Sequence, residues 1–187
     1  MSSDIFSRKI NVTDFDLIYA GAQKNMGPAG TTLVIVKDEV LGKTNRSIPT
    51  MLDYTTHIKK DSMFNTPPVF AVYVSMLTLE WLKKNGGVEW IEKINQEKAD
   101  LIYSEIDRNP LFKGSSTVED RSNMNVTFLL NDTSLEDLFN QMWQAAGCNG
   151  LKGHRSVGGF RASMYNALPI ESVQVLVDVM QELERKV

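Results

Sequence analysis

The apolar positions follow a strand-like pattern in the first part of the chain. Residues 15–20 (FDLIYA) and 31–37 (TTLVIVK) are short, nearly continuous apolar runs, typical of strands covered on both faces in an α/β sheet. The connection between them is too tight for a parallel crossover, so we expect antiparallel pairing or a place at a sheet edge. Residues 42–66 hold few apolar runs and predict a long irregular segment, a kind of loop that is usually functional or covers a partner.

Helical spacing dominates the rest of the chain. A helix should follow residue 66, with Thr66 as its N-cap, Pro67 and Pro68 in its first turn and Gly86–Gly87 ending it. Further helices are expected over 88–107, 134–147 (capped by Ser134) and about 169–185, and a strand over 123–130. The predicted buried stripes of these three helices are Val88, Ile91, Ile94, Leu101 and Ile102, then Leu135, Leu138, Phe139, Met142, Trp143 and Ala146, then Val173, Leu176, Val177, Met180 and Leu183.

The order of these elements predicts two regions within an α/β protein. Residues 88–187 form a compact α+β unit in this interpretation. Residues 1–87 contain too few strands to cover their own sheet, so we expect them to be part of a larger domain. An incomplete sheet of this kind should expose apolar surface, associate and be poorly soluble without its other half.

Composition narrows the class of protein. The chain has 187 residues, 42% of them hydrophobic, and a net charge of −3, which argues against a nucleic-acid or anionic-membrane surface. No apolar run approaches the ~18 residues of a membrane span, and no signal-peptide core is present at the N-terminus. The single cysteine, Cys148, excludes an internal disulfide and fits a reducing compartment. We therefore expect a soluble, cytoplasmic chain, and two histidines alone predict no metal site.

The first candidate site is Gln23-Lys24-Asn25, followed by Gly27-Pro28-Ala29-Gly30. A partly buried lysine is a good amine nucleophile, and amines react with aldehydes to give Schiff bases. Small neighbours would let a bulky planar cofactor approach the backbone. The alternative is an ordinary Gly-Pro turn with a solvated lysine. A phosphate loop is excluded because no Gly-Lys-Ser/Thr closes the stretch.

The second candidate site is GHRSVGGFRAS, residues 153–163, which places His154, Arg155 and Arg161 in one glycine-rich stretch. Guanidinium groups bind carboxylate and phosphate through paired hydrogen bonds, and a histidine adds a donor. The alternative is a solvated basic loop.

A third, weaker candidate is Asn65-Thr66, which could donate to a phosphate at a helix N-terminus. Simple capping by Thr66 is the alternative.

Together, YAGAQKNMGPAG, FNTPPVFAVY and GHRSVGGFRASMYNA resemble, in order, the most specific segments of the phosphoserine aminotransferase family. This family belongs to the class-V, fold-type I transferases that depend on pyridoxal 5′-phosphate. The resemblance covers essentially the whole chain. It implies that residues 1–87 are the end of the large cofactor-binding domain and that 88–187 are the small C-terminal domain.

The resemblance also implies residue roles. Lys24 would form the Schiff base with the cofactor aldehyde and move a proton between substrate and cofactor, with Gln23 beside the cofactor phosphate. Asn65 and Thr66 would reach that phosphate from the neighbouring subunit of a homodimer.

Substrate binding is implied for the second candidate site. Arg161 would hold the substrate α-carboxylate, and His154 and Arg155 would bind the distal anion. The implied ping-pong reaction converts 3-phosphohydroxypyruvate and glutamate to phosphoserine and 2-oxoglutarate in serine biosynthesis, and some members also serve pyridoxine biosynthesis.

This chain departs from the family pattern in length. It resembles only the C-terminal half, so it lacks the phosphate cup, the aromatic that stacks on the cofactor ring, and the N-terminal His/Arg groups of the anion site. The aspartate that pairs with the pyridine nitrogen is also missing. We therefore expect the chain to be inactive without an N-terminal half. The alternatives are another class-V transaminase and a non-catalytic α/β module in which Lys24 is structural.

Overall fold

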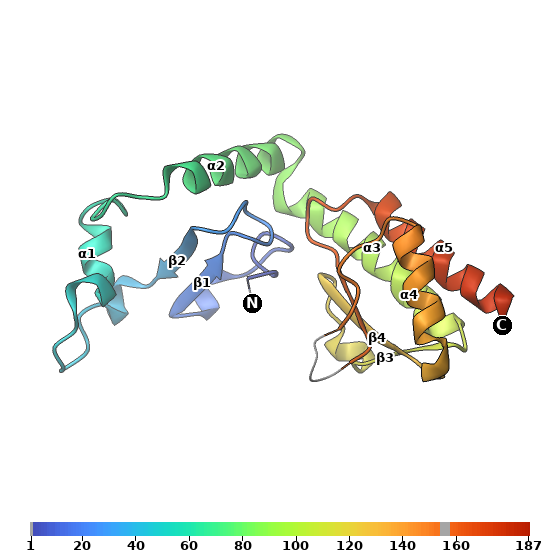
Figure 1. The fold of residues 1–187 in the computed structure, drawn as a ribbon. Coiled ribbons are helices and arrows are strands. Elements are labelled where there is room, and N and C mark those ends of the chain that lie inside the picture. The colour runs from blue at the N-terminus through green and yellow to red at the C-terminus, as the bar shows by residue number, and fades with distance from the viewer. Residues whose placement is uncertain (1, 154–157) are drawn as a thin grey trace. The chain divides into compact units, whose positions relative to one another are not determined.

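The computed structural model describes residues 2–153 and 158–187. The chain divides into two compact units, Met1–Gly87 (unit 1) and Val88–Val187 (unit 2), which are described separately. Figure 1 labels their helices and strands.

Unit 1 is built on a two-stranded sheet. Strands β1 (Leu17–Gly21) and β2 (Thr32–Val36) pair antiparallel, with Tyr19 opposite Val34, which confirms the predicted pairing. Two helices follow, the short α1 (Tyr54–Ile58) and the long α2 (Val69–Lys84). Apart from α1 and one 3₁₀ turn, Thr50–Leu52, residues 42–66 are irregular, as predicted.

The predicted start of α2 is wrong. The helix begins at Val69 with Pro68 as its N-cap, and the amide of Val72 donates to the Pro68 carbonyl. Thr66 lies before it and does not cap it. Because a proline disfavours helical backbone at the preceding residue, Pro68 keeps Pro67 out of the helix and moves the start past both prolines.

Unit 1 buries little of its own apolar surface. Its core consists of Ile5, Ala20, Ala22 and Met26, and α2 buries only Ala71 and Leu82. Along α2 the exposed large side chains are Val69, Phe70, Val72, Tyr73, Met76, Leu77 and Trp81. Tyr19 of β1 is 70% exposed, so the prediction that both faces of these strands are covered is wrong within this chain. A two-stranded sheet packed against one long helix has too few elements to cover both of its faces.

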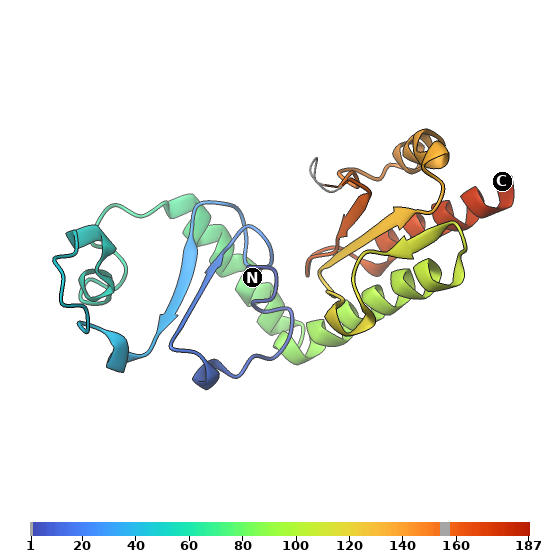
Figure 2. The same ribbon diagram turned by 90° about the horizontal axis from the view of Figure 1, so that it is seen from below.

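Unit 2 is an α+β unit with a three-stranded antiparallel sheet in the order β3-β4-β5. Its elements are α3 (Gly87–Arg108), β3 (Phe112–Gly114), β4 (Asn125–Leu130), α4 (Glu136–Ala145), β5 (Phe160–Ser163) and α5 (Ile170–Lys186). Figures 1 and 2 both show α3 and α5 side by side, and Arg108 of α3 forms a salt bridge with Glu184 of α5. Strand β3, only three residues long, was not predicted.

The core of unit 2 lies between this sheet and the helices. Alternation along β4 buries Val126, Phe128 and Leu130, and leaves Asn125 and Thr127 on the other face. Phenylalanines at 112, 128, 139 and 160 pack together, with ring centroids 4.9 Å apart for the closest pair, Phe139 and Phe160. The predicted stripe of α5 is buried throughout.

One cap was assigned to the wrong residue in unit 2. Asp132, not Ser134, provides the side-chain cap, because its carboxylate accepts from the Ser134 amide at a 3₁₀ turn that leads into α4. Hydrogen bonds from the Ser134 side chain and from its amide hold the pKa of Asp132 below its usual value. Among the described residues, no helix is both long enough and apolar enough to span a membrane.

Candidate active site

Lys24 lies in the connection between β1 and β2, residues 22–31 (the Lys24 turn). The amides of Met26 and Gly27 both donate to the carbonyl of Ala22, at 3.0 and 2.9 Å, and the Ala22 amide donates to Thr31. This winds the backbone into a single compact turn. Lys24 is half-buried in it, and Gln23 beside it is exposed.

Hydrogen bonds to the first residues of the chain hold the Lys24 turn in place. Asn25 is buried, and its side-chain amide donates to the carbonyls of Ser3 and Ile5 at 2.7 and 2.9 Å. At the end of β1, the Gly21 amide donates to the Ser2 hydroxyl at 2.9 Å. The position of Lys24 therefore depends on contacts about 20 residues away in sequence, which no local pattern reveals.

The glycines of the turn face α2. A Cβ at Gly27 would lie 2.8 Å from the Ser75 hydroxyl oxygen and 3.1 Å from the Ser75 Cα, and one at Gly30 would lie 3.0 Å from the Ala71 Cβ. Both glycines have positive φ, 152° and 129°. Where the sequence suggested room for a cofactor, the structure shows that Gly27 and Gly30 allow the turn to pack on α2.

Asn65 and Thr66 are exposed in the segment that precedes α2. The Asn65 amide donates to the Thr66 carbonyl at 3.2 Å. Their side chains belong to unit 1, as Gln23 and Lys24 do.

Arg161 belongs to unit 2, where it lies exposed on β5 opposite Thr127 of β4. Its amide donates to the Leu151 carbonyl at 2.7 Å, and the Gly153 amide donates to Gly159. The chain on either side of residues 154–157 is thus paired. His154 and Arg155, the other two residues of this candidate site, lie outside the described residues.

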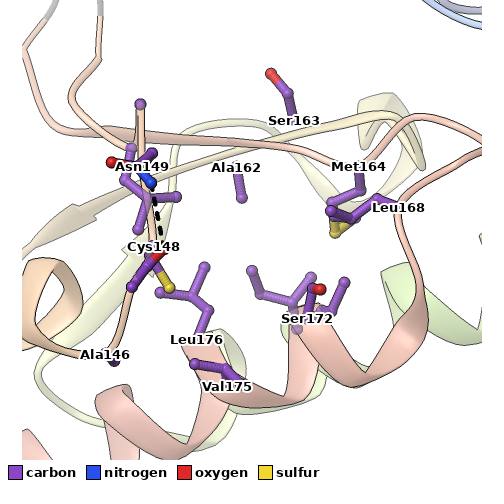
Figure 3. Close-up of a pocket in the computed structure, with 15 residues that line it drawn as sticks. Ala146, Cys148, Asn149, Ala162, Ser163, Met164, Leu168, Ser172, Val175 and Leu176 are labelled. Carbon is purple, nitrogen blue, oxygen red and sulfur yellow. Dashed lines mark hydrogen bonds between the residues drawn. The ribbon is translucent and has the colours of Figure 1, made fainter.

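A cavity of about 390 Å³ lies in unit 2 between α5, β5 and residues 146–151 (Figure 3). Its lining is mainly apolar, with Ala162 and Met164 of the β5 side facing Leu176 of α5. Burial raises the pKa of the Cys148 thiol at its rim. None of the predicted site residues that the structure describes lines this cavity, and its described lining holds no charged group to bind an anion.

Within residues 2–153 and 158–187, no group of three or more His, Cys, Asp or Glu side chains could hold a metal ion. The predicted site residues of unit 1 offer an amine, two amides and a hydroxyl, and the described one in unit 2, Arg161, offers a guanidinium.

Comparison with known proteins assigns the chain to a family. The chain belongs to the class-V aminotransferases, whose family model matches residues 1–176.

Its relatives point to one kind of aminotransferase. The chain is 71% identical over all of its length to a phosphoserine aminotransferase from Flavobacterium psychrophilum, and covers 52% of that protein. The chain therefore spans about half the length of the curated relatives it matches.

Solved structures of the same kind superpose on the chain. A phosphoserine aminotransferase in which radiation damage of the Schiff base was studied is 48% identical, with a TM-score of 0.95, and this chain covers 52% of it and matches over 100% of its own length. A phosphoserine aminotransferase from Trichomonas vaginalis with bound PLP is 38% identical, with a TM-score of 0.90, over 97% of this chain and 52% of that one.

Proposed function

We propose that this chain is the C-terminal part of a phosphoserine aminotransferase that uses pyridoxal 5′-phosphate and carries Lys24 as its catalytic lysine. The observation that carries the proposal is the Lys24 turn, which holds a half-buried lysine on a braced backbone. The 71% identity to a phosphoserine aminotransferase over the whole chain supports the same assignment.

The donor set fits the cofactor. Pyridoxal phosphate carries an aldehyde, which reacts with a primary amine, and a phosphate, which needs hydrogen-bond donors. Lys24 offers the amine. Gln23, Asn65 and Thr66 are exposed and offer two amides and a hydroxyl.

When bound, the cofactor would supply the electron sink that stabilises negative charge at the substrate α-carbon. Lys24 would accept the proton from that carbon and return it to the cofactor C4′ position, acting as base and then acid. The bond from Asn25 to the N-terminal segment would keep the lysine backbone in place during both transfers.

Arg161 would bind the substrate α-carboxylate through paired hydrogen bonds, since an exposed guanidinium on a strand is free to meet a carboxylate. His154 and Arg155 would bind the distal anion, which is the phosphate of phosphoserine or the side-chain carboxylate of glutamate. One anion site used by both substrates in turn suits the transfer of an amino group from glutamate to 3-phosphohydroxypyruvate.

The exposed apolar face of unit 1 supports the expectation of partners. Exposed side chains such as Phe70, Tyr73 and Trp81 of α2, and Leu52 and Met63 before it, would be costly to leave in water in a complete protein. We infer that they are covered by the missing half of the large domain and by a second subunit. Asn65 and Thr66 would then reach the cofactor phosphate of the neighbouring subunit of a homodimer.

The cellular role follows from the same proposal. The enzyme would act in the cytoplasm, in serine biosynthesis, with a related phosphorylated oxo acid of pyridoxine biosynthesis as a second substrate.

The test is an activity assay on a chimera in which this chain replaces the corresponding half of the Flavobacterium psychrophilum relative. We expect the chimera to form phosphoserine from glutamate and 3-phosphohydroxypyruvate, and Lys24→Ala to lower kcat by about 10³-fold or more. Lys83→Ala, on the exposed end of α2, is the matched control and should leave the rate unchanged. Wild-type activity in Lys24→Ala, or a preference for alanine over glutamate in the unaltered chimera, would contradict the proposal.

A further inference from the structure

Helix α3 carries polar side chains into the core of unit 2. Asn95, Lys98 and Glu105 are all buried on it, and Lys98 is 0% exposed. The Lys98 ammonium donates to three backbone carbonyls, those of Met164 (3.2 Å), Tyr165 (3.0 Å) and Leu168 (3.1 Å). All three N–H donors of the ammonium are thereby satisfied.

This arrangement is a poor choice for packing alone. Moving an ammonium out of water is costly, and burial lowers the pKa of Lys98 to about 8. A methionine would fill similar space without that cost. What the lysine adds is a fixed position for three carbonyls in one short segment, because one cation holds all three together.

The segment that Lys98 holds directly follows Arg161. Strand β5 ends at Ser163, and residues 164–168 connect it to α5. Asn95 bonds to Asn166 at 2.9 Å, one turn before Lys98 on α3. The segment is therefore anchored to α3 by two buried side chains.

The other face of the sheet anchors the same residues. Ser163 and Tyr165 donate their hydroxyl hydrogens to the side-chain oxygen of Asn125, at 3.1 and 3.3 Å. The Met164 amide donates to the Met124 carbonyl at 2.8 Å. A strand of four residues has few ladder bonds of its own, so these anchors decide how rigidly β5 is placed.

Rigid placement matters for Arg161. A guanidinium recognises a carboxylate through a planar pair of hydrogen bonds, and small displacements of the backbone misalign that pair. The Arg161 side chain is long and exposed, so its base must be fixed for the bound geometry to be favoured over others.

We propose that Lys98 is a positioning residue for substrate binding, which fixes the segment after β5 and thereby holds Arg161 in place to receive the substrate carboxylate. The inference rests on the proposed role of Arg161. It adds Lys98, a buried residue of unit 2 that would affect substrate binding without touching the substrate.

The test uses the same full-length chimera with Lys98→Met. Because the carboxylate contact is weakened equally in ground and transition states, we expect the KM values for glutamate and phosphoserine to rise about tenfold while kcat changes less than about threefold. Affinity for pyridoxal phosphate, titrated by absorbance, should be unchanged, since Gln23, Lys24, Asn65 and Thr66 all belong to unit 1.

The matched control is Asn109→Ala. Asn109 is equally buried on the C-terminal side of α3, and its amide bonds to Glu105 and Met180, away from residues 163–168. This variant should lower thermal stability, because it removes buried hydrogen bonds, and leave both KM values unchanged. Equal KM shifts in the two variants would show that any disturbance of the unit 2 core weakens substrate binding, and would overturn the specific role of Lys98.

Two milder variants cover the case in which Lys98→Met fails to fold. Lys98→Gln keeps a donor, and Asn166→Ala removes the bond to Asn95 and leaves the Lys98 contacts in place, so each should fold and raise KM by about threefold. Wild-type KM values in either folded variant would overturn the proposal. Arg161→Ala separates the two ideas, because unchanged KM values there would refute the role of Arg161 itself.

Discussion

Unit 2 packs four phenylalanines against one another in a closed core, whereas unit 1 leaves Phe70 of α2 75% exposed. Both units have well-formed helices and paired strands, so secondary structure alone does not explain the difference. Unit 2 covers one face of its sheet with its own helices, and unit 1 has a two-stranded sheet and one helix that covers little of it.

The comparison shows that a segment can have well-ordered local structure in a unit that does not bury its own core. The Lys24 turn is fully braced by hydrogen bonds within unit 1 even though the unit around it is open. A turn can thus be shaped by hydrogen bonds to its own neighbourhood even where the unit that contains it leaves much apolar surface exposed.

The largest expected effect comes from separating the units. Residues 88–187 produced alone should unfold cooperatively in urea, because they contain a complete core. Residues 1–87 alone should show no cooperative transition and should bind a hydrophobic dye. Circular dichroism and dye fluorescence on the two fragments check this, and a cooperative transition in residues 1–87 would break the comparison.

The next effect is at single phenylalanines. Phe139→Ala should cost unit 2 about 3–5 kcal/mol in free energy of unfolding, since it leaves a cavity in the core. Phe70→Ala on α2 should change the stability of this 187-residue chain by less than about 0.5 kcal/mol, because the ring is in water already.

The same two substitutions, Phe139→Ala and Phe70→Ala, should have more similar costs in the full-length chimera. There, Phe70→Ala should become destabilising by about 2 kcal/mol or more, because the second half or a second subunit buries the ring. Urea denaturation of both variants in both proteins measures this. A Phe70→Ala cost that is equally small in the chimera would contradict the inferred cover over α2.

A pH effect is expected from Lys98. Its pKa is about 8 in the folded chain and 10.5 when exposed, so between these values the unfolded state binds more protons. The cost of burying the ammonium is present below pH 8 and is lost as pH rises, which adds up to about 3 kcal/mol to the free energy of unfolding by pH 10.5.

The measurement compares residues 88–187 with the Lys98→Met variant of the same fragment in urea from pH 7 to 10.5. Only the wild type should gain stability from this source, so the difference between the two curves should change with pH. A difference that is constant with pH would show that Lys98 does not titrate in this range.

The smallest expected effect is at Asn25. Asn25→Ala removes two hydrogen bonds to the N-terminal segment and should cost about 1–3 kcal/mol locally. In the chimera, amide hydrogen exchange of residues 22–27 should speed up while that of unit 2 stays the same. Unchanged exchange in the Lys24 turn would mean that the N-terminal segment does not brace it.

Much of unit 2 could be predicted from apolar spacing, because its core is closed within the chain. Val173, Leu176, Val177, Met180 and Leu183 follow a helical period, and all of them are buried in α5. Apolar spacing could not predict that Asn95, Lys98 and Glu105 are buried on α3, because it assigns polar residues to the surface.

Local boundaries were predicted less well. Thr66 and Ser134 are good capping residues, but the prolines at 67–68 move the start of α2, and the carboxylate of Asp132 caps the 3₁₀ turn that leads into α4. For the candidate site, motif resemblance pointed to Lys24, while the Asn25 bonds that place it span 20 and 22 residues and could not be predicted from local sequence.

The most direct test of the central claim is to map the lysine that binds the cofactor. The chimera would be incubated with pyridoxal phosphate, reduced with borohydride, digested and analysed by mass spectrometry. The account predicts that the phosphopyridoxyl group is found on Lys24 and that Lys24→Ala loses it. An adduct on another lysine in an active protein, or an active protein with no adduct at Lys24, would contradict the account.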